Sequence, residues 1–343
     1  MSEKLAIYQI QPGDTMELVS SRIGMSIEQL RDFHNRYCEQ KGLLWLSGFT
    51  GITKIIIPAD FKHPDEARAE RKKYLPGKYF ERGFLANYYN VEEIFTSQDS
   101  EKLTITYTLQ IDVTTQKINQ EELWIAAVKA FNHKRNGEVP DDKMSSLELA
   151  CMEAIAPVGF VISSQGNLDG LYNSAELLSR FDAKRENLED FYIGEINEAY
   201  LLKFRESLTD EKYLFARLAS SMLYQFLFPG MQMFHQQVIG QKEFVLQSGS
   251  FPVRCKYQTE ADFSNDDTTL VTVRAKSNDS CSLPELVRGV RTETSTDEPL
   301  DGDLTIMYTL SKEDKQVEKI ETTTVLRFDE EEYSTYQLNL VKR

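Results

Sequence analysis

Apolar and polar positions in the first sixty residues follow two kinds of pattern. Strand-like apolar segments stand around Tyr8 and Ile10 and again from Ile52 to Pro58. Between them, apolar residues recur at helical spacing in two short segments, of which the first ends near Gly24. The sequence therefore predicts a strand, two helices and a second strand, which together make a small two-layer unit.

Two capping signals support these helices. Asp14 with Glu17, and Ser26 with Gln29, have the spacing of a capping box, in which two side chains satisfy backbone N–H groups at the helix start. Gly24 stands where a left-handed residue commonly ends a helix. We therefore predict Asp14 as the N-cap of the first helix and Ser26 as the N-cap of the second.

The order and spacing of these residues resemble a LysM module. The resemblance covers residues 6–58 and rests on Tyr8, Ile10, Gly13-Asp14-Thr15, Gly24, Leu30, Asn35 and Ile55-Ile56-Ile57-Pro58. LysM modules bind glycans built on N-acetylglucosamine, including peptidoglycan and chitin, between the loop after the first strand and the loop before the second. The resemblance implies that Gly13, Asp14, Thr15 and Met16 form one lip of that groove.

The loop before the second strand departs from the LysM pattern. Residues 36–49 are longer than the family usually allows there, and they include Trp45 and Phe49. Aromatic side chains beside a glycan groove stack on sugar rings, so Trp45 and Phe49 are candidate ligand-binding residues. The alternative is that residues 43–46 pack the loop against the helices or the second domain, since four consecutive apolar residues rarely stay in water.

A change of composition after Pro58 predicts a domain boundary. Residues 1–58 form the module, and residues 59–75 are predicted to be a charged linker with a short helix at 66–73. From 76 to 343, strand-like alternation, helical periodicity and strand-like alternation follow one another. This order predicts an α+β domain in which an antiparallel sheet packs on a helical layer.

Individual elements of the larger domain follow from the same periodicities. Predicted strands lie at 103–111, 158–162, 253–258, 268–275, 303–310, 319–328 and 334–341. Predicted helices lie at 121–134, 145–156 with Ser145 or Ser146 as cap, 173–180, 195–208 and 210–228. Turns are predicted at Gly166, Gly170, Asn265–Asp267 and Asp301-Gly302.

Composition and charge exclude several classes of partner. Apolar residues make up 41% of the chain and aromatic residues 11%, so a core can form. The formal net charge is −15, and nearly all of it falls after residue 60. An acidic body repels phosphate backbones and anionic lipid heads, so we expect neither nucleic acid nor a membrane surface as partner. No segment has the apolar length of a membrane span, so membrane insertion is not expected.

Compartment signals point to the cytoplasm. The first residues lack the apolar run and cleavage pattern of a Sec signal. The four cysteines are widely spaced and contain no C-x-x-C, which favours isolated, mostly buried thiols in a reducing compartment. We expect a cytoplasmic protein, or one exported by a non-Sec route.

Catalytic and metal-binding motifs are not found. The sequence has no H-E-x-x-H, G-x-S-x-G, phosphate-loop or EF-hand spacing. His34, His63, His133 and His235 are scattered singly, and Cys151 lies in an apolar helical segment that favours an inert core thiol over a nucleophile. We therefore predict no catalytic residue, no metal site and no cofactor.

Three functions fit these observations, and we favour the first. It is a non-catalytic binding or adaptor protein whose module docks a glycan with N-acetylglucosamine or a protein partner. Leaderless LysM-like modules occur in contractile, phage-tail-like injection assemblies, so a structural or effector-loading part of a bacterial type VI-like assembly is implied. The second is a cell-wall protein that holds peptidoglycan while its second domain acts on the wall, for example as a hydrolase. The third is a body in which the sheet wraps a helix and sequesters a ligand or lipid.

Overall fold

The computed structural model describes residues 5–39, 42–45, 48–59, 71–98, 100–118, 121–235, 239–292 and 300–343. The chain divides into two compact units, residues 1–73 and 74–343. Within the predicted linker, residues 60–70 lie outside the described part, and most of the helix predicted at 66–73 lies there too.

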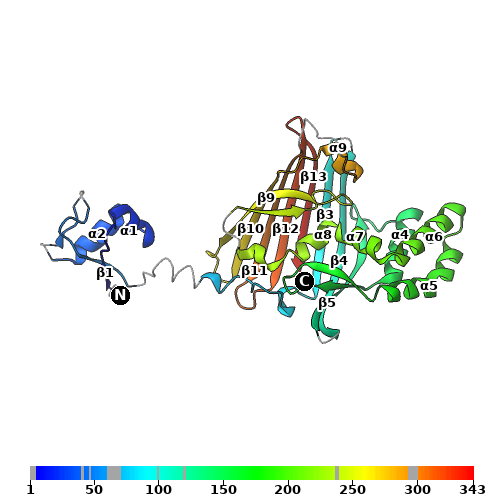
Figure 1. The fold of residues 1–343 in the computed structure, drawn as a ribbon, viewed down its shortest axis with the longest axis horizontal. Coiled ribbons are helices and arrows are strands. Elements are labelled where there is room, and N and C mark those ends of the chain that lie inside the picture. The colour runs from blue at the N-terminus through cyan, green and yellow to red at the C-terminus, as the bar shows by residue number, and fades with distance from the viewer. Residues whose placement is uncertain are drawn as a thin grey trace. The chain divides into compact units, whose positions relative to one another are not determined.

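The N-terminal unit is a β-α-α-β module (Figure 1). β1 (Leu5–Gln9) pairs antiparallel with β2 (Lys54–Pro58), and α1 (Met16–Arg22) and α2 (Ile27–Tyr37) lie between them in the chain. Apolar side chains from both helices, from β2 and from the loop before it form one core: Met16, Val19, Leu30, Leu44, Ile55 and Ile57. The predicted order of strand, two helices and strand is confirmed.

The two helix caps of the module differ. Ser26 Oγ accepts the N–H of Gln29 at 3.1 Å and Gln29 Oε1 accepts the N–H of Ser26 at 2.9 Å, so the predicted capping box is present at α2. At α1 the prediction was wrong by one residue, because Thr15 is the N-cap and its Oγ1 accepts the N–H of Leu18 at 3.2 Å. Asp14 does not cap the helix because its carboxylate is engaged elsewhere in the module.

Over its described residues, the larger unit has one antiparallel sheet of eleven strands, ordered β7-β6-β5-β4-β3-β13-β12-β11-β10-β9-β8. The strands are β3 (Tyr88–Ser97), β4 (Ser100–Ile118), β5 (Glu121–Arg135), β6 (Val158–Ile162), β7 (Leu168–Tyr172), β8 (Gly240–Phe244), β9 (Val253–Asp262), β10 (Thr268–Ser277), β11 (Asp301–Ser311), β12 (Val317–Phe328) and β13 (Glu331–Lys342). Two meanders of consecutive strands, β3–β7 and β8–β13, meet where β3 pairs with β13.

Helices lie beside this sheet and against the concave face that it forms by bending. They are η2 (Arg82–Phe84), α4 (Lys143–Ile155), α5 (Ser174–Phe191), α6 (Glu195–Thr209), α7 (Glu211–Ala219), α8 (Met222–Leu227), η3 (Met231–His235) and α9 (Leu283–Arg288). α4, α5 and α6 gather beside one end of the sheet (Figure 1), and Phe181 of α5 contacts Phe204 of α6 with ring centroids 5.2 Å apart. Within the described residues, no helix combines the length and the apolar character needed to cross a membrane.

The sheet curves around α8. Tyr224 of α8 contacts Phe160 of β6, with ring centroids 4.8 Å apart, and the carbonyl of Phe226 accepts the hydroxyl of Tyr308 of β11 at 3.0 Å. β6 and β11 are six strand steps apart in the sheet order, which is about 29 Å in a flat sheet. α8 is only about 9 Å long. The sheet therefore bends until distant strands face the same short helix.

The predicted class, α+β with an antiparallel sheet packed on helices, is confirmed. Every predicted strand falls on an observed strand, and most observed strands are longer than predicted. The alternation was readable because the inner positions of these strands are buried, as in β9 and β11, where buried and more exposed residues alternate along most of the strand.

The segment 121–134 was predicted as a helix and is the strand β5. Ile125 and Ala126 point to opposite faces of the sheet, yet they are only 4% and 0% exposed. A strand that is buried on both faces carries apolar residues at successive positions and loses its alternation. Apolar residues at 123, 124, 127, 128 and 131 then fit helical spacing by coincidence.

Smaller errors concern caps and turns. The helix predicted at 210–228 is broken at Ser220-Ser221 into α7 and α8, and the one predicted at 173–180 continues to Phe191. Neither Ser145 nor Ser146 caps α4: Asp142 does, and its carboxylate accepts the N–H of Ser145 at 2.8 Å. Gly170 and Asp301-Gly302 lie inside β7 and β11, because sheet pairing there overrides the local turn preference.

Candidate functional site

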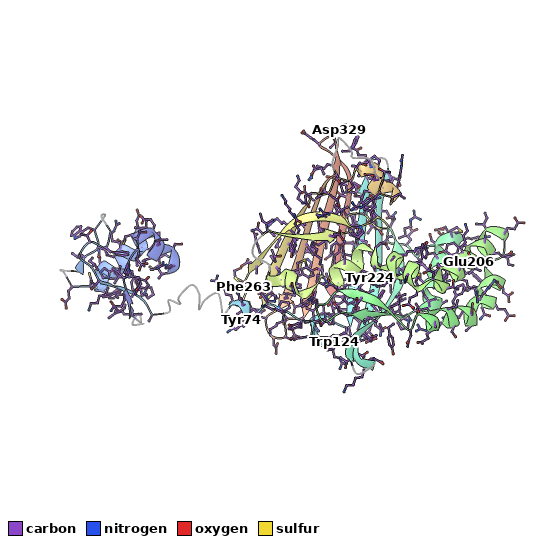
Figure 2. The ribbon with its side chains drawn as sticks, viewed as in Figure 1. Tyr74, Trp124, Glu206, Tyr224, Phe263 and Asp329 are labelled. Atoms are coloured by element: carbon purple, nitrogen blue, oxygen red, sulfur yellow. The ribbon has the colours of Figure 1, made fainter. Side chains whose placement is uncertain are left out.

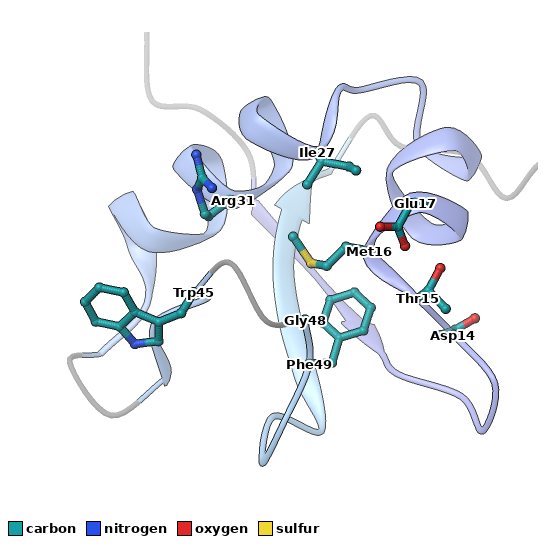
Figure 3. Close-up of a pocket in the computed structure, with 9 residues that line it drawn as sticks. All are labelled: Asp14, Thr15, Met16, Glu17, Ile27, Arg31, Trp45, Gly48 and Phe49. Atoms are coloured by element: carbon teal, nitrogen blue, oxygen red, sulfur yellow. The ribbon is translucent and has the colours of Figure 1, made fainter.

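A cleft of about 500 Å³ opens on the N-terminal module between the start of α1, α2 and the loop before β2 (Figure 3). Five of the six predicted ligand-binding residues line it: Asp14, Thr15, Met16, Trp45 and Phe49. Four further residues line it that the sequence did not assign to the site: Glu17, Ile27, Arg31 and Gly48. The structure thus brings the two predicted lips together around one cavity.

The first lip is the beginning of α1. Thr15 caps the helix, and Met16 is only 6% exposed because it also belongs to the module core. Gly13 is not among the lining residues of the cleft. Its φ of 92° lies in the left-handed region that glycine adopts at low cost. Gly13 therefore makes the turn that leads into the lip.

The carboxylate of Asp14 holds this turn together. Its side chain is 2% exposed. Oδ2 accepts the hydroxyl of Tyr8 at 2.9 Å and the N–H of Gln11 at 2.8 Å, and Oδ1 accepts Nη1 of Arg22 at 2.5 Å. Arg22 also donates to the Tyr8 hydroxyl at 3.0 Å. Asp14 therefore stabilises the lip and does not present a free carboxylate to a ligand.

These contacts also set the ionisation of Asp14. Burial raises the pKa of the carboxyl, but the hydrogen bonds from Gln11, Tyr8 and Arg22 outweigh burial and hold the pKa below its usual value. A carboxyl whose pKa is lower in the folded state stabilises that state above its unfolded pKa, about 3.9. The stabilisation disappears as the pH falls through the lowered folded pKa.

We expect Asp14→Asn to lower the melting temperature of the module at neutral pH, because a neutral amide binds Arg22 more weakly. The difference from the wild type should begin to shrink below about pH 4, where the carboxyl of the unfolded chain becomes protonated, and should vanish below the lowered pKa of the folded state. Calorimetry across a pH series measures the melting temperatures of both proteins and how their difference changes with pH. Asp32→Asn is the matched control, since the Asp32 side chain is 70% exposed. A difference for Asp14→Asn that stays constant into strong acid would contradict this account.

The second lip is the inserted loop, and two neighbouring residues of α2 fix it. His34 is 2% exposed; its Nε2 lies 2.8 Å from the carbonyl of Gly42, and its Nδ1 accepts the N–H of Ile56 at 2.8 Å. Nδ1 must be unprotonated to accept, so the ring is neutral and Nε2 donates. Asn35 binds both backbone groups of Leu44, donating to its carbonyl at 3.0 Å and accepting its N–H at 2.7 Å.

Trp45 directly follows this anchored position. Leu44 is 1% exposed and enters the module core, whereas Trp45 is 70% exposed. The predicted packing of residues 43–46 is therefore right for Leu44 and wrong for Trp45, and Leu46 lies outside the described residues. Phe49 is partly buried against the same core.

The cleft combines an exposed aromatic ring with polar groups of both charges. Figure 3 shows Trp45 toward one end and Thr15 and Glu17 toward the other, with Met16 and Phe49 between them. The hydroxyl, carboxylate and guanidinium groups can bind sugar hydroxyls, and the rings can stack on the apolar face of a sugar.

The residues of α2 that line the cleft carry a signal in their spacing. Ile27 and Arg31 stand four positions apart, so they share one face of the helix. That face lies beside Trp45 in the same cleft. Ile27 and Arg31 could have been found from this spacing, since it places one apolar and one cationic residue on a helix face beside a predicted recognition loop.

Outside the cleft, thiol and metal-binding groups are the other chemistry-bearing side chains of the chain. Cys151 is buried, and burial raises the pKa of its thiol to about 12, so it stays protonated at neutral pH. The prediction that Cys151 lies in the core is confirmed. Across the ranges that the structure describes, no three His, Cys, Asp or Glu side chains gather as a possible metal site.

No model of a known protein family matches the chain, and no curated protein is significantly similar to it.

Proposed function

We propose that the chain is a non-catalytic binding protein whose N-terminal, LysM-like module docks a glycan that contains N-acetylglucosamine. The observation that carries this proposal is Trp45, which is 70% exposed at a cleft of about 500 Å³. Indole is costly to leave in water, and a large ring kept there beside a cleft commonly serves a ligand.

The support of the loop strengthens this proposal. The hydrogen bonds from His34 to Gly42 and from Asn35 to Leu44 fix the backbone immediately before Trp45. Backbone that is already held at Gly42 and Leu44 loses less conformational entropy when a ligand binds, so more of the stacking energy appears as affinity. The inserted loop therefore supplies a recognition element instead of closing the groove.

Co-sedimentation with insoluble peptidoglycan and with chitin tests the proposal. We expect the wild type to be retained and Trp45→Ala to bind about tenfold more weakly, since loss of an aromatic stack costs about 1.4 kcal/mol. Phe191→Ala in the larger unit is the matched control, because Phe191 is 78% exposed. The proposal fails if the wild type is not retained by either polymer, or if Trp45→Ala is retained equally well.

A specific observation favours a second candidate, an adaptor that also binds a protein, as in a contractile injection assembly. The end of α5, the start of α6 and the turn between them expose Phe191, Ile196 and Ile193 to 78%, 76% and 77%. Residues 186–198 around it include five Glu or Asp and no Lys or Arg. An apolar tip in acidic surroundings fits a protein surface with an apolar pocket bordered by basic residues.

Quantitative co-purification from the native cell tests this candidate. A genuine partner should be lost with Ile193→Ser and weakened with Glu195→Lys, which reverses one charge beside the tip. Trp45→Ala should leave its recovery unchanged. Recovery that is the same for all variants would contradict docking at the tip.

A further inference from the structure

A groove of about 740 Å³ lies on the larger unit. One wall is residues 128–134 of β5, and the other includes Leu149 and Met152 of α4. Tyr224 of α8 also lines it, and Figure 2 labels this residue near the centre of the unit. The volume falls within the range of about 300–1,000 Å³ that is typical of small-molecule sites.

The groove exists because two neighbours of β5 differ in length. β4 pairs with β5 as far as Arg135, whereas β6 pairs with it only from Trp124 to Val128. Beyond Val128, no second neighbour of β5 is found among the described strands. Side chains from both faces of β5 line the cavity, as expected for a cavity that runs along a strand edge.

This free edge carries two features that oppose the addition of another strand. The register between β4 and β5 shifts between Thr106 and Thr108, and Asn132 has a φ of 59°, which together mark a bulge. Lys129 and Lys134 place charges along the same edge. Bulges and lysines are the means by which exposed edges avoid strand pairing, so a small molecule is the better occupant.

Two polar side chains of the groove are uncharged at neutral pH. Burial raises the pKa of Tyr224 to about 12, and within the described residues its hydroxyl makes no hydrogen bond. Burial lowers the pKa of His133, so its ring is neutral. That ring stacks on Tyr107 with centroids 5.2 Å apart. The charged residues that line the groove are Lys129, Lys134 and Glu153, of which Lys134 and Glu153 are exposed and Lys129 is half-buried.

We propose that this groove binds a small apolar molecule that ends in an uncharged hydrogen-bonding group, such as an acyl chain with an alcohol, ester or amide head. Leu149, Met152 and Val158 cover the apolar part. Tyr224 donates to the head, and the neutral ring of His133 offers one donor and one acceptor. The site lies wholly in the larger unit and does not depend on glycan binding by the module.

Fluorescence of the neutral dye N-phenyl-1-naphthylamine with the full chain tests the proposal. We expect saturable binding, displacement by dodecanol and monolaurin, and weaker displacement by dodecanoate. Val139→Asp should weaken dye binding at least about tenfold, because it places a charge in the groove at a residue that is 70% exposed and tolerates substitution. Val290→Asp, at 62% exposure outside the groove, is the matched control.

Tyr224→Phe tests recognition of the ligand's polar head separately from binding of its acyl chain. It should leave dye binding unchanged and weaken displacement by dodecanol about fivefold to tenfold, the effect of one lost hydrogen bond. Absence of saturable dye binding, or equal binding by Val139→Asp and the control, would overturn the proposal. So would tighter binding of dodecanoate than of dodecanol, or displacement by an extended valine-threonine peptide and not by dodecanol.

Discussion

Replacing His34 with leucine is expected to unfold the N-terminal module at temperatures where the larger unit stays folded. The ring joins Gly42 of the loop to Ile56 of β2, and it is 2% exposed. Leucine leaves the part-buried carbonyl of Gly42 and the part-buried N–H of Ile56 without their side-chain partner, at about 1–3 kcal/mol each. A module of this size is stable by only about 3–8 kcal/mol, so most of its stability is lost.

Differential scanning calorimetry measures this effect, since two compact units should melt in separate transitions. Only the transition of the module should shift. Trp45→Ala is the control from the same module. Trp45 is 70% exposed, so its replacement should change the unfolding free energy by no more than about 0.5 kcal/mol. An unchanged module transition in His34→Leu would show that the two hydrogen bonds are not important for stability.

In the larger unit, Phe226→Ala is expected to cost about 3–5 kcal/mol of unfolding free energy. Phe226 is 1% exposed on α8, around which the sheet bends, and its backbone carbonyl accepts the Tyr308 hydroxyl. Truncation removes the ring from the place where distant strands converge, and the surrounding strands can close such a cavity only in part.

Urea unfolding of the full chain measures this loss. Phe191→Ala applies the same chemical change at 78% exposure, so it should alter the unfolding free energy by no more than about 0.5 kcal/mol. Equal effects of the two substitutions would mean that α8 is not part of the core. A change of unfolding slope in Phe226→Ala alone would show that the denatured or native state has changed in compactness.

The fold of the module was predictable because its signals are local. The capping box of Ser26 and Gln29 spans four residues, and a strand such as β2 is a short apolar run. The role of Asp14 was not predictable, because its partners Tyr8 and Arg22 come near it only in the folded module. A carboxylate ahead of a helix looks the same in sequence whether it caps the helix or binds an arginine.

In the larger unit, too, prediction failed where the structure depends on residues that are distant in sequence. Strands with one inner and one outer face, such as β11, were found from their alternation. β5 was mistaken for a helix because neighbours in the fold bury both of its faces. In the candidate site, Trp45 was identified from its type and place, whereas the anchoring roles of His34 and Asn35 depend on where the loop folds back.

The pairing of β3 with β13 has a consequence for synthesis on the ribosome. Each meander is built from neighbours in sequence, but β3 and β13 join residues more than two hundred positions apart, such as Phe95 and Tyr336. During translation, β3 and β12 each keep one unpaired edge until β13 has been synthesised and can pair with both. The continuous sheet therefore forms only after the more than two hundred residues that separate β3 from β13 have been synthesised, and the nascent chain is a natural client for a chaperone until then.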